Sequence, residues 1–228
     1  MKFKTLKVES IEPRLFYLFS ILNLIPIFLV KHYGALDAPL HLYQSNVIAE
    51  LWKSNELFEQ FYRFNPIIVG NLTSQFILGF FNFIFPAWIA EKILLSIFIL
   101  GLAFSFRYLI LGINKKSSFI SFLIFPFTYS TFFHLAYYNY VLGILVMLIV
   151  FGYWVRVENN LTVQKILVLL LLFTLLFLTH IFVYTFFVGS FGLYLLFSLF
   201  INLINKNKFT FRIFSKKRHL HLLPLFQA

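Results

Sequence analysis

Long runs of apolar residues, separated by short polar stretches, dominate the chain. Six of them have the length of a membrane-spanning helix: residues 15–31, 88–111, 117–134, 141–157, 163–179 and 181–204. A helix needs about 20 consecutive apolar residues to cross the bilayer, with a range of about 17–25. The pattern therefore predicts an all-α protein, built as a polytopic bundle of about six transmembrane helices.

A seventh apolar run, at 67–86, is interrupted by polar residues. These are Asn71, Thr73, Ser74, Gln75 and Asn82. The distribution of Lys and Arg decides whether this run crosses, because both are enriched at the cytoplasmic ends of helices. If the run does not cross, 15 of the 19 basic residues lie inside, whereas only 5 do so if it crosses and the N-terminus stays inside.

The charge distribution therefore predicts six spans, with both termini in the cytoplasm. It also makes 67–86 a re-entrant or surface-lying element on the outer side. A non-spanning segment at membrane depth needs protein or water to satisfy its backbone. The polar residues of this segment therefore suggest that it lines a cavity.

The first outer loop, 32–66, has a different pattern. Apolar residues recur with helical spacing between 40 and 62, at Leu40, Tyr43, Val47, Leu51, Phe58 and Phe61. This periodicity predicts an amphipathic helix that lies on the outer membrane surface. Asp37 occupies the position of a helix N-cap, and Pro39 falls in the first turn.

Composition agrees with a multi-pass protein of the cell membrane. The chain is 61% hydrophobic and 12% charged, against about 45–50% and about 25% for soluble domains. The net charge of +11 follows from a basic cytoplasmic N-terminus (1–14) and a basic cytoplasmic C-terminal segment (205–228) around the bundle (15–204), so no nucleic-acid partner is needed. The absence of Cys excludes disulfides and thiolate metal sites. Arg107, near an inner helix end, is expected to reach the lipid headgroups.

The predicted topology places the polar residues of three outer connections on one side. They are Asp37 and His41, His134 and Asn139, and His180. Each also has a simpler interpretation: a helix cap for Asp37, a surface residue for His41, an interfacial anchor for His134 and a turn marker for His180. The location of all these residues on one side of the membrane favours a site at the outer face, because intramembrane ionisable residues are costly and commonly functional.

The layout of the chain resembles the integral-membrane glycosyltransferases of the GT-C type. This superfamily contains lipid-phosphate-sugar-dependent mannosyl, aminoarabinosyl and oligosaccharyl transferases. The resemblance covers about 15–204 and is closest to a bacterial branch with an Asp-x-Pro-x-His-like first loop. The segments that carry it are Asp37-Ala38-Pro39-Leu40-His41, Asn65-Pro66, the Glu91-Lys92 helix start and Tyr137-Tyr138-Asn139-Tyr140.

The resemblance implies that Asp37 is the first-loop acid, acting as base or metal ligand on a polyprenyl-phosphate sugar donor. The implied substrate-binding residues are His41, Lys92, His134, Tyr138, Asn139 and His180. The second outer loop often bears another acid in this superfamily, and this chain has none there, so a divalent metal stays an open question. From the residues alone, Glu91 and Lys92 are also expected to form a local ion pair.

Other functional classes stay open beside the enzyme. A transporter, flippase or assembly subunit would place polar residues along a path at mid-depth, and the predicted spans carry few of them. Enzymes of this type usually have further spans and an outer C-terminal domain, whereas this chain ends after one basic segment. The resemblance therefore predicts a truncated or fragment chain, and an inactive remnant is a third interpretation.

Overall fold

The computed structural model describes residues 8–67 and 69–204, which form helices and short connections without any β-strand. The predicted all-α class is confirmed. The basic C-terminal segment, 205–228, lies outside the described residues, and so do residues 1–7 of the N-terminal segment. In the described part of the chain, four helices are long and apolar enough to cross a membrane: Ile11–Phe28, Ala87–Ile113, Tyr138–Val157 and Ile181–Ile201.

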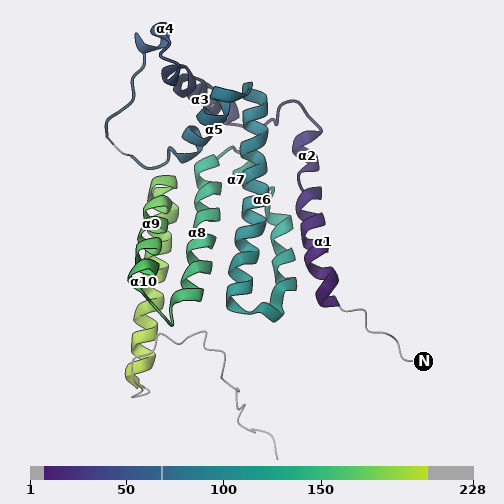
Figure 1. Ribbon diagram of the computed structural model, residues 1–228, viewed down its shortest axis with the longest axis vertical. Coiled ribbons are helices and arrows are strands. Elements are labelled where there is room, and N and C mark those ends of the chain that lie inside the picture. The colour runs from purple at the N-terminus through teal and green to yellow at the C-terminus, as the bar shows by residue number, and fades with distance from the viewer. Residues whose placement is uncertain (1–7, 68, 205–228) are drawn as a thin grey trace, which may run out of the picture.

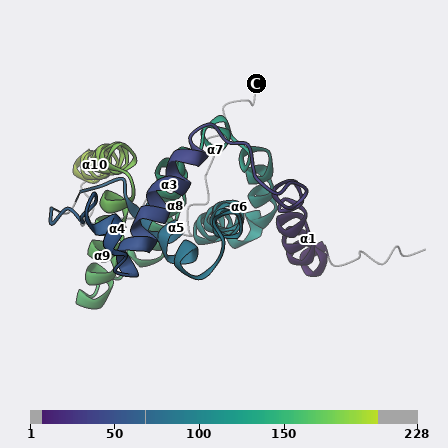
Figure 2. The ribbon, with the colours of Figure 1, turned by 90° about the horizontal axis from the view of Figure 1, so that it is seen from above.

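The long helices run beside one another, and three short helices gather at one end (Figure 1). Their bounds are α1 (Val8–Leu22), α2 (Ile25–Phe28), α3 (Ala38–Trp52), α4 (Glu56–Glu59), α5 (Thr73–Ile84), α6 (Ala87–Ile113), the 3-10 helix η1 (Lys115–Phe127), α7 (Thr131–His134), α8 (Tyr138–Val157), α9 (Val163–Thr179) and α10 (Ile181–Ile204). We call α3, α4 and α5 the cap. Viewed from above, α1 lies at one edge of the bundle and α9 and α10 at the other (Figure 2).

The predicted surface helix of 40–62 is two helices. Ser54 has a positive φ of 54°, which ends α3. The Asn55 side chain then accepts a hydrogen bond from the backbone N–H of Leu57 and starts α4. The α3 helix also packs closely on α5, since a Cβ atom at Gly79 would lie 2.8 Å from Ile48. It therefore shares a packed interface with α5 instead of contacting only lipid.

The ambiguous run at 67–86 contains α5, a helix of 12 residues. At 1.5 Å per residue it is about 18 Å long, which is short against a hydrocarbon core of about 30 Å. Its buried side includes Ser74, Gln75, Leu78 and Gly79. Two of the polar residues of this run, Ser74 and Gln75, are therefore directed into the protein.

The predicted span at 117–134 is an irregular segment. It begins as η1, continues through a turn and ends with α7. Ser117 has non-helical backbone angles, and Pro126 stands inside η1. Proline has no N–H to donate and disfavours a regular α-helix, which explains why this segment differs from its neighbours.

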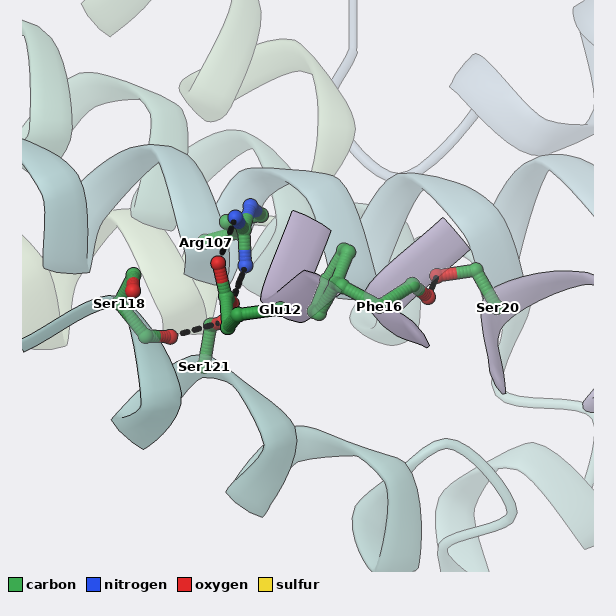
Figure 3. A network of polar contacts seen from close by, with 6 residues as sticks. All are labelled: Glu12, Phe16, Ser20, Arg107, Ser118 and Ser121. Carbon is green, nitrogen blue, oxygen red and sulfur yellow. Dashed lines mark hydrogen bonds and ion pairs between the residues drawn. The ribbon is translucent and has the colours of Figure 1, made fainter. Parts of the chain in front are cut away.

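A polar network joins α1 to α6 and η1 (Figure 3). The Arg107 guanidinium donates to both carboxylate oxygens of Glu12, at 2.6 and 2.9 Å, and to Ser121 Oγ at 2.9 Å. It also lies 4.4 Å from the centre of the Phe16 ring. The Glu12 side chain is only 7% exposed. Arg107 therefore forms an ion pair within the protein, with a partner that the expected headgroup contact did not include.

Candidate functional site

The loop before α3 is joined by its backbone to the turn between α7 and α8. The N–H of Leu36 donates to the carbonyl of His134 at 3.1 Å, and the N–H of Asp37 donates to the carbonyl of Leu135 at 3.3 Å. Ala136 in this turn has a positive φ of 59°. Two of the segments singled out in the sequence, about a hundred residues apart, thus lie side by side at the cap end.

Asp37 stands at the N-cap of α3, as its sequence position predicts. Its side chain makes no capping hydrogen bond, and its carboxylate forms no hydrogen bond or ion pair with any residue that the structure describes. Its charge acts on His41, one turn further along α3. The capping interpretation thus explains where Asp37 lies but leaves its carboxylate free to accept a proton or bind a ligand.

His134 is bound by an aromatic side chain. The Tyr33 hydroxyl and His134 Nδ1 are 3.0 Å apart, and the two rings stack with centroids 6.0 Å apart. Tyr33 precedes Asp37 in the same loop. The interfacial-anchor interpretation of His134 therefore gains a specific partner on the loop that carries the candidate base.

His41 begins a hydrogen-bond network that crosses from the cap to α8. Gln75 Nε2 donates to His41 Nδ1 at 3.2 Å, and Gln75 Oε1 accepts from Asn139 Nδ2 at 2.8 Å. Asn139 Nδ2 also donates to the carbonyl of Asn71 at 2.6 Å, while its Oδ1 accepts from the N–H of Ser74 at 2.8 Å. Every polar atom of the Asn139 side chain is therefore engaged. We call His41, Gln75 and Asn139, with Asn71 and Ser74, the cap network.

The environment of His41 keeps its imidazole neutral. Burial holds the pKa of His41 below its ordinary value of 6.5, and this effect outweighs a hydrogen bond to the backbone of Ala136 and the charge of Asp37, which both raise the pKa. A neutral ring with its proton on Nε2 accepts from Gln75 at Nδ1 and still has a donor for the Ala136 backbone. This tautomer satisfies both of its neighbours.

The depressed pKa makes the stability of the protein depend on pH. Below pH 6.5 the unfolded chain binds a proton at this ring more readily than the folded chain does. The stabilisation by His41 is therefore complete above pH 6.5 and is lost as the pH falls. We expect the unfolding temperature in detergent to drop between pH 7.5 and pH 5, and to drop less in the His41→Gln variant. Equal drops in both proteins would contradict the assignment.

Tyr138 connects the cap network to a carboxylate on α6. Its ring lies 4.9 Å from the ring of His41, and its hydroxyl donates to Glu91 Oε1 at 3.1 Å. Tyr138 and Glu91 are both almost completely buried. The ion pair predicted between Glu91 and Lys92 is wrong, because consecutive helical residues point in different directions and the Lys92 ammonium lies over the rings of Phe28 and Trp88.

His180 is connected to the cap network indirectly. Asn71 has a positive φ of 64° and binds the turn between α9 and α10: its N–H donates to the carbonyl of Leu178 at 2.9 Å, and its Oδ1 accepts from the N–H of Ile181 at 3.1 Å. The His180 ring itself lies edge-on to Tyr140 at 5.2 Å. His180 thus marks a turn that the cap network holds in place, without touching His41.

Asn139 links three parts of the fold, so its removal has a predictable effect. Asn139→Ala leaves the N–H of Ser74, the carbonyl of Asn71 and the amide oxygen of Gln75 without this partner in a buried region. Each unsatisfied buried group costs about 1–3 kcal/mol. We expect a loss of about 3 kcal/mol in the free energy of unfolding, measured by denaturant titration in detergent. The exposed Asn114→Ala variant is the control, and an equal loss there would contradict this role for Asn139.

An apolar pocket opens beside the cap network. Its volume is about 530 Å³, and it lies between α3, α5, the loop that joins α4 to α5, and Leu178 of α9. Its polar lining residues include Arg63, Asn65 and Thr73, and Thr73 adjoins Ser74 of the network. Ligand pockets typically have volumes of about 300–1,000 Å³. The segments 32–66 and 67–86 therefore line a space large enough for part of a lipid, although of the polar residues in 67–86 only Thr73 borders it.

The residues of the site do not fit an all-protein metal centre. In residues 8–67 and 69–204, no group of three or more His, Asp or Glu side chains lies close enough to hold a metal ion. Asp37 and His41 could supply two ligands.

Sequence reasoning missed four residues of the site. Three lie on α5 or in the turn before it, Asn71, Ser74 and Gln75, and the fourth is Glu91 of α6. Their one signal in the sequence is polarity inside an otherwise apolar run. Comparison with known proteins found no matching family model, no matching curated protein and no matching solved structure.

Proposed function

We propose that the chain is a GT-C-type membrane glycosyltransferase that takes a sugar from a polyprenyl-phosphate donor at the outer membrane face. The observation that carries the proposal is the free carboxylate of Asp37. The backbone of Leu36 and Asp37 is held by hydrogen bonds to the turn of His134, and Asp37 lies one helical turn from His41 of the cap network. An apolar pocket of about 530 Å³ lies beside that network.

In this proposal the chain crosses the membrane six times. Two further spans join the four long helices: η1 with α7, and the 17-residue α9. The turns after α7 and α9 lie at the cap end, and the turns after α6 and α8 lie at the opposite end (Figure 1). The opposite end then carries Lys115, Lys116, Arg156 and Lys165 and faces the cytoplasm, as the positive-inside rule requires. The cap faces outward.

The proposed reaction is a single displacement at the anomeric carbon. A hydroxyl oxygen of the acceptor attacks that carbon while Asp37 takes the hydroxyl proton. The bond between the anomeric carbon and the phosphate oxygen breaks, and polyprenyl phosphate leaves with the bonding electrons. One displacement inverts the anomeric centre. Asp37 then releases its proton to water.

The other residues have distinct roles in this scheme. The leaving phosphate needs positive charge or hydrogen-bond donors, and Arg63 at the pocket supplies a cation. His41, Tyr138 and Asn139 are occupied by protein partners, so they act as positioning residues for α3 and Asp37. His134 orients the loop through Tyr33, and His180 marks the turn held by Asn71.

The proposal is tested with the purified full-length protein in lipid vesicles that contain a polyprenyl-phosphate-linked sugar. Formation of a new glycoside and release of polyprenyl phosphate, both lost in Asp37→Asn, would support it. Movement of the lipid-linked sugar between leaflets without any glycoside would instead support a flippase. If the protein shows neither sugar transfer nor flipping with any donor tried, an inactive remnant becomes the better interpretation.

A further inference from the structure

Lys92 is a buried cation that forms no ion pair with any described acidic side chain. Its side chain lies in the second turn of α6 and is only 8% exposed. Its ammonium is 5.4 Å from the ring centre of Phe28 and 5.6 Å from that of Trp88. No residue that the structure describes accepts a hydrogen bond from it or pairs with it at ion-pair distance. Glu91 attracts it from further away, but that carboxylate accepts from Tyr138.

The side chain of Lys92 lines an apolar groove. This groove has a volume of about 740 Å³ and runs along α6 from Trp88 to Phe104, with Phe28 of α2 on its other wall. Its lining is otherwise mostly aliphatic and aromatic, and the hydroxyl of Ser96 donates to the carbonyl of Lys92. A bare cation at one end of an apolar groove is costly in a membrane unless an anion joins it.

The dimensions of the groove match one leaflet of a bilayer. Lys92 and Phe104 are 12 residues apart, which is about 18 Å along a helix, and half of the hydrocarbon core is about 15 Å thick. The groove ends at Phe104, whose ring packs on that of Phe16 at 6.0 Å. Near this end the Arg107–Glu12 pair joins α1 to α6. The groove is thus open to an extended hydrocarbon chain that starts at Lys92.

We propose that this groove binds an anionic phospholipid, with its phosphate at Lys92 and an acyl chain along α6. A phosphate would pair with the ammonium, and the mostly aliphatic and aromatic wall would cover a hydrocarbon chain. The site faces away from the cap network, because Glu91 and Lys92 point to different sides of α6. The inference therefore goes beyond the transferase proposal and assigns Lys92 to a lipid site outside the transfer centre.

Native mass spectrometry of the full chain tests this inference. The protein is purified in detergent with equal amounts of palmitoyl-oleoyl phosphatidylglycerol and phosphatidylcholine. Lys92→Met is expected to lower the preference for the anionic lipid roughly fivefold, and Lys92→Arg is expected to retain it. The exposed Lys31→Met makes the same change in charge outside the groove and is expected to leave the preference unchanged.

A groove-filling variant separates the acyl chain from the charge. Ile97→Trp keeps the ammonium and occupies the groove, so it is expected to lower retention of both lipids, and it provides the test if Lys92→Met does not fold. Wild-type lipid retention in either variant would overturn the inference. Binding of water-soluble glycerol 3-phosphate as tight as that of the phospholipid would overturn it as well, because the acyl chain would then contribute nothing.

Discussion

Asp37→Asn is expected to lower sugar transfer by about 10²–10⁴-fold, the usual contribution of a positioned general base. Asparagine has nearly the same shape but cannot take the proton of the attacking hydroxyl. The fold should tolerate the change, because the Asp37 side chain makes no capping hydrogen bond. The measurement is the initial rate of glycoside formation in vesicles with a polyprenyl-phosphate-linked sugar.

The matched control for this variant is Glu56→Gln. Glu56 is an exposed acid in the first turn of another cap helix, α4, so it tests whether loss of any cap carboxylate impairs transfer. We expect its turnover to equal that of the wild type. Unchanged turnover in Asp37→Asn would remove Asp37 as the base.

Arg107→Met is expected to destabilise the protein by about 3–5 kcal/mol, because removing one partner of a buried ion pair leaves the other uncompensated. The Glu12 carboxylate would lose both of its guanidinium hydrogen bonds. Ser121 Oγ would lose the hydrogen bond that it accepts from Arg107 of α6. The measurement is the free energy of unfolding in detergent, obtained by denaturant titration and near-ultraviolet circular dichroism.

Replacing both partners provides the control for this effect. The double variant Glu12→Gln with Arg107→Met removes the unpaired charge and is expected to recover part of the lost stability. Arg107→Lys keeps the charge but cannot bind both carboxylate oxygens with one planar group, so an intermediate loss is expected. A loss below about 1 kcal/mol in Arg107→Met would show that the pair adds little to holding α1 on α6.

The helical class and most helix positions follow from local pattern in the sequence. Apolar runs, the Asp37–Pro39 helix start and the polar interruption at 67–86 are local features that composition and spacing reveal. The break between α3 and α4 was missed, because it depends on the left-handed conformation of Ser54, which no pattern of polarity specifies. The 3-10 geometry of η1 was missed as well, although Pro126 hinted at irregularity.

The candidate site could be predicted only in part, because its contacts join distant segments. Sequence reasoning placed Asp37, His41 and Asn139 on one side, but it could not pair His41 with Gln75, 34 residues away. It paired Glu91 with its neighbour Lys92, whereas the partner of Glu91 is Tyr138, 47 residues away. Likewise, Arg107 and Glu12 are 95 residues apart. Such partners are set by helix packing, which local patterns do not encode.

The proposed outward orientation of the cap is tested most directly by cysteine labelling in intact cells. The sequence contains no Cys, so in each single-Cys variant the introduced thiol is the only one in the protein that can be labelled. Leu36→Cys places a thiol in the loop before α3, where Leu36 is 71% exposed, and Lys116→Cys and Asn160→Cys place thiols in the connections at the opposite end. A membrane-impermeant maleimide should label the first variant in intact cells and the other two only after permeabilisation. Labelling of Lys116→Cys and Asn160→Cys in intact cells, with protection of Leu36→Cys, would contradict the proposed topology and the outer-face site.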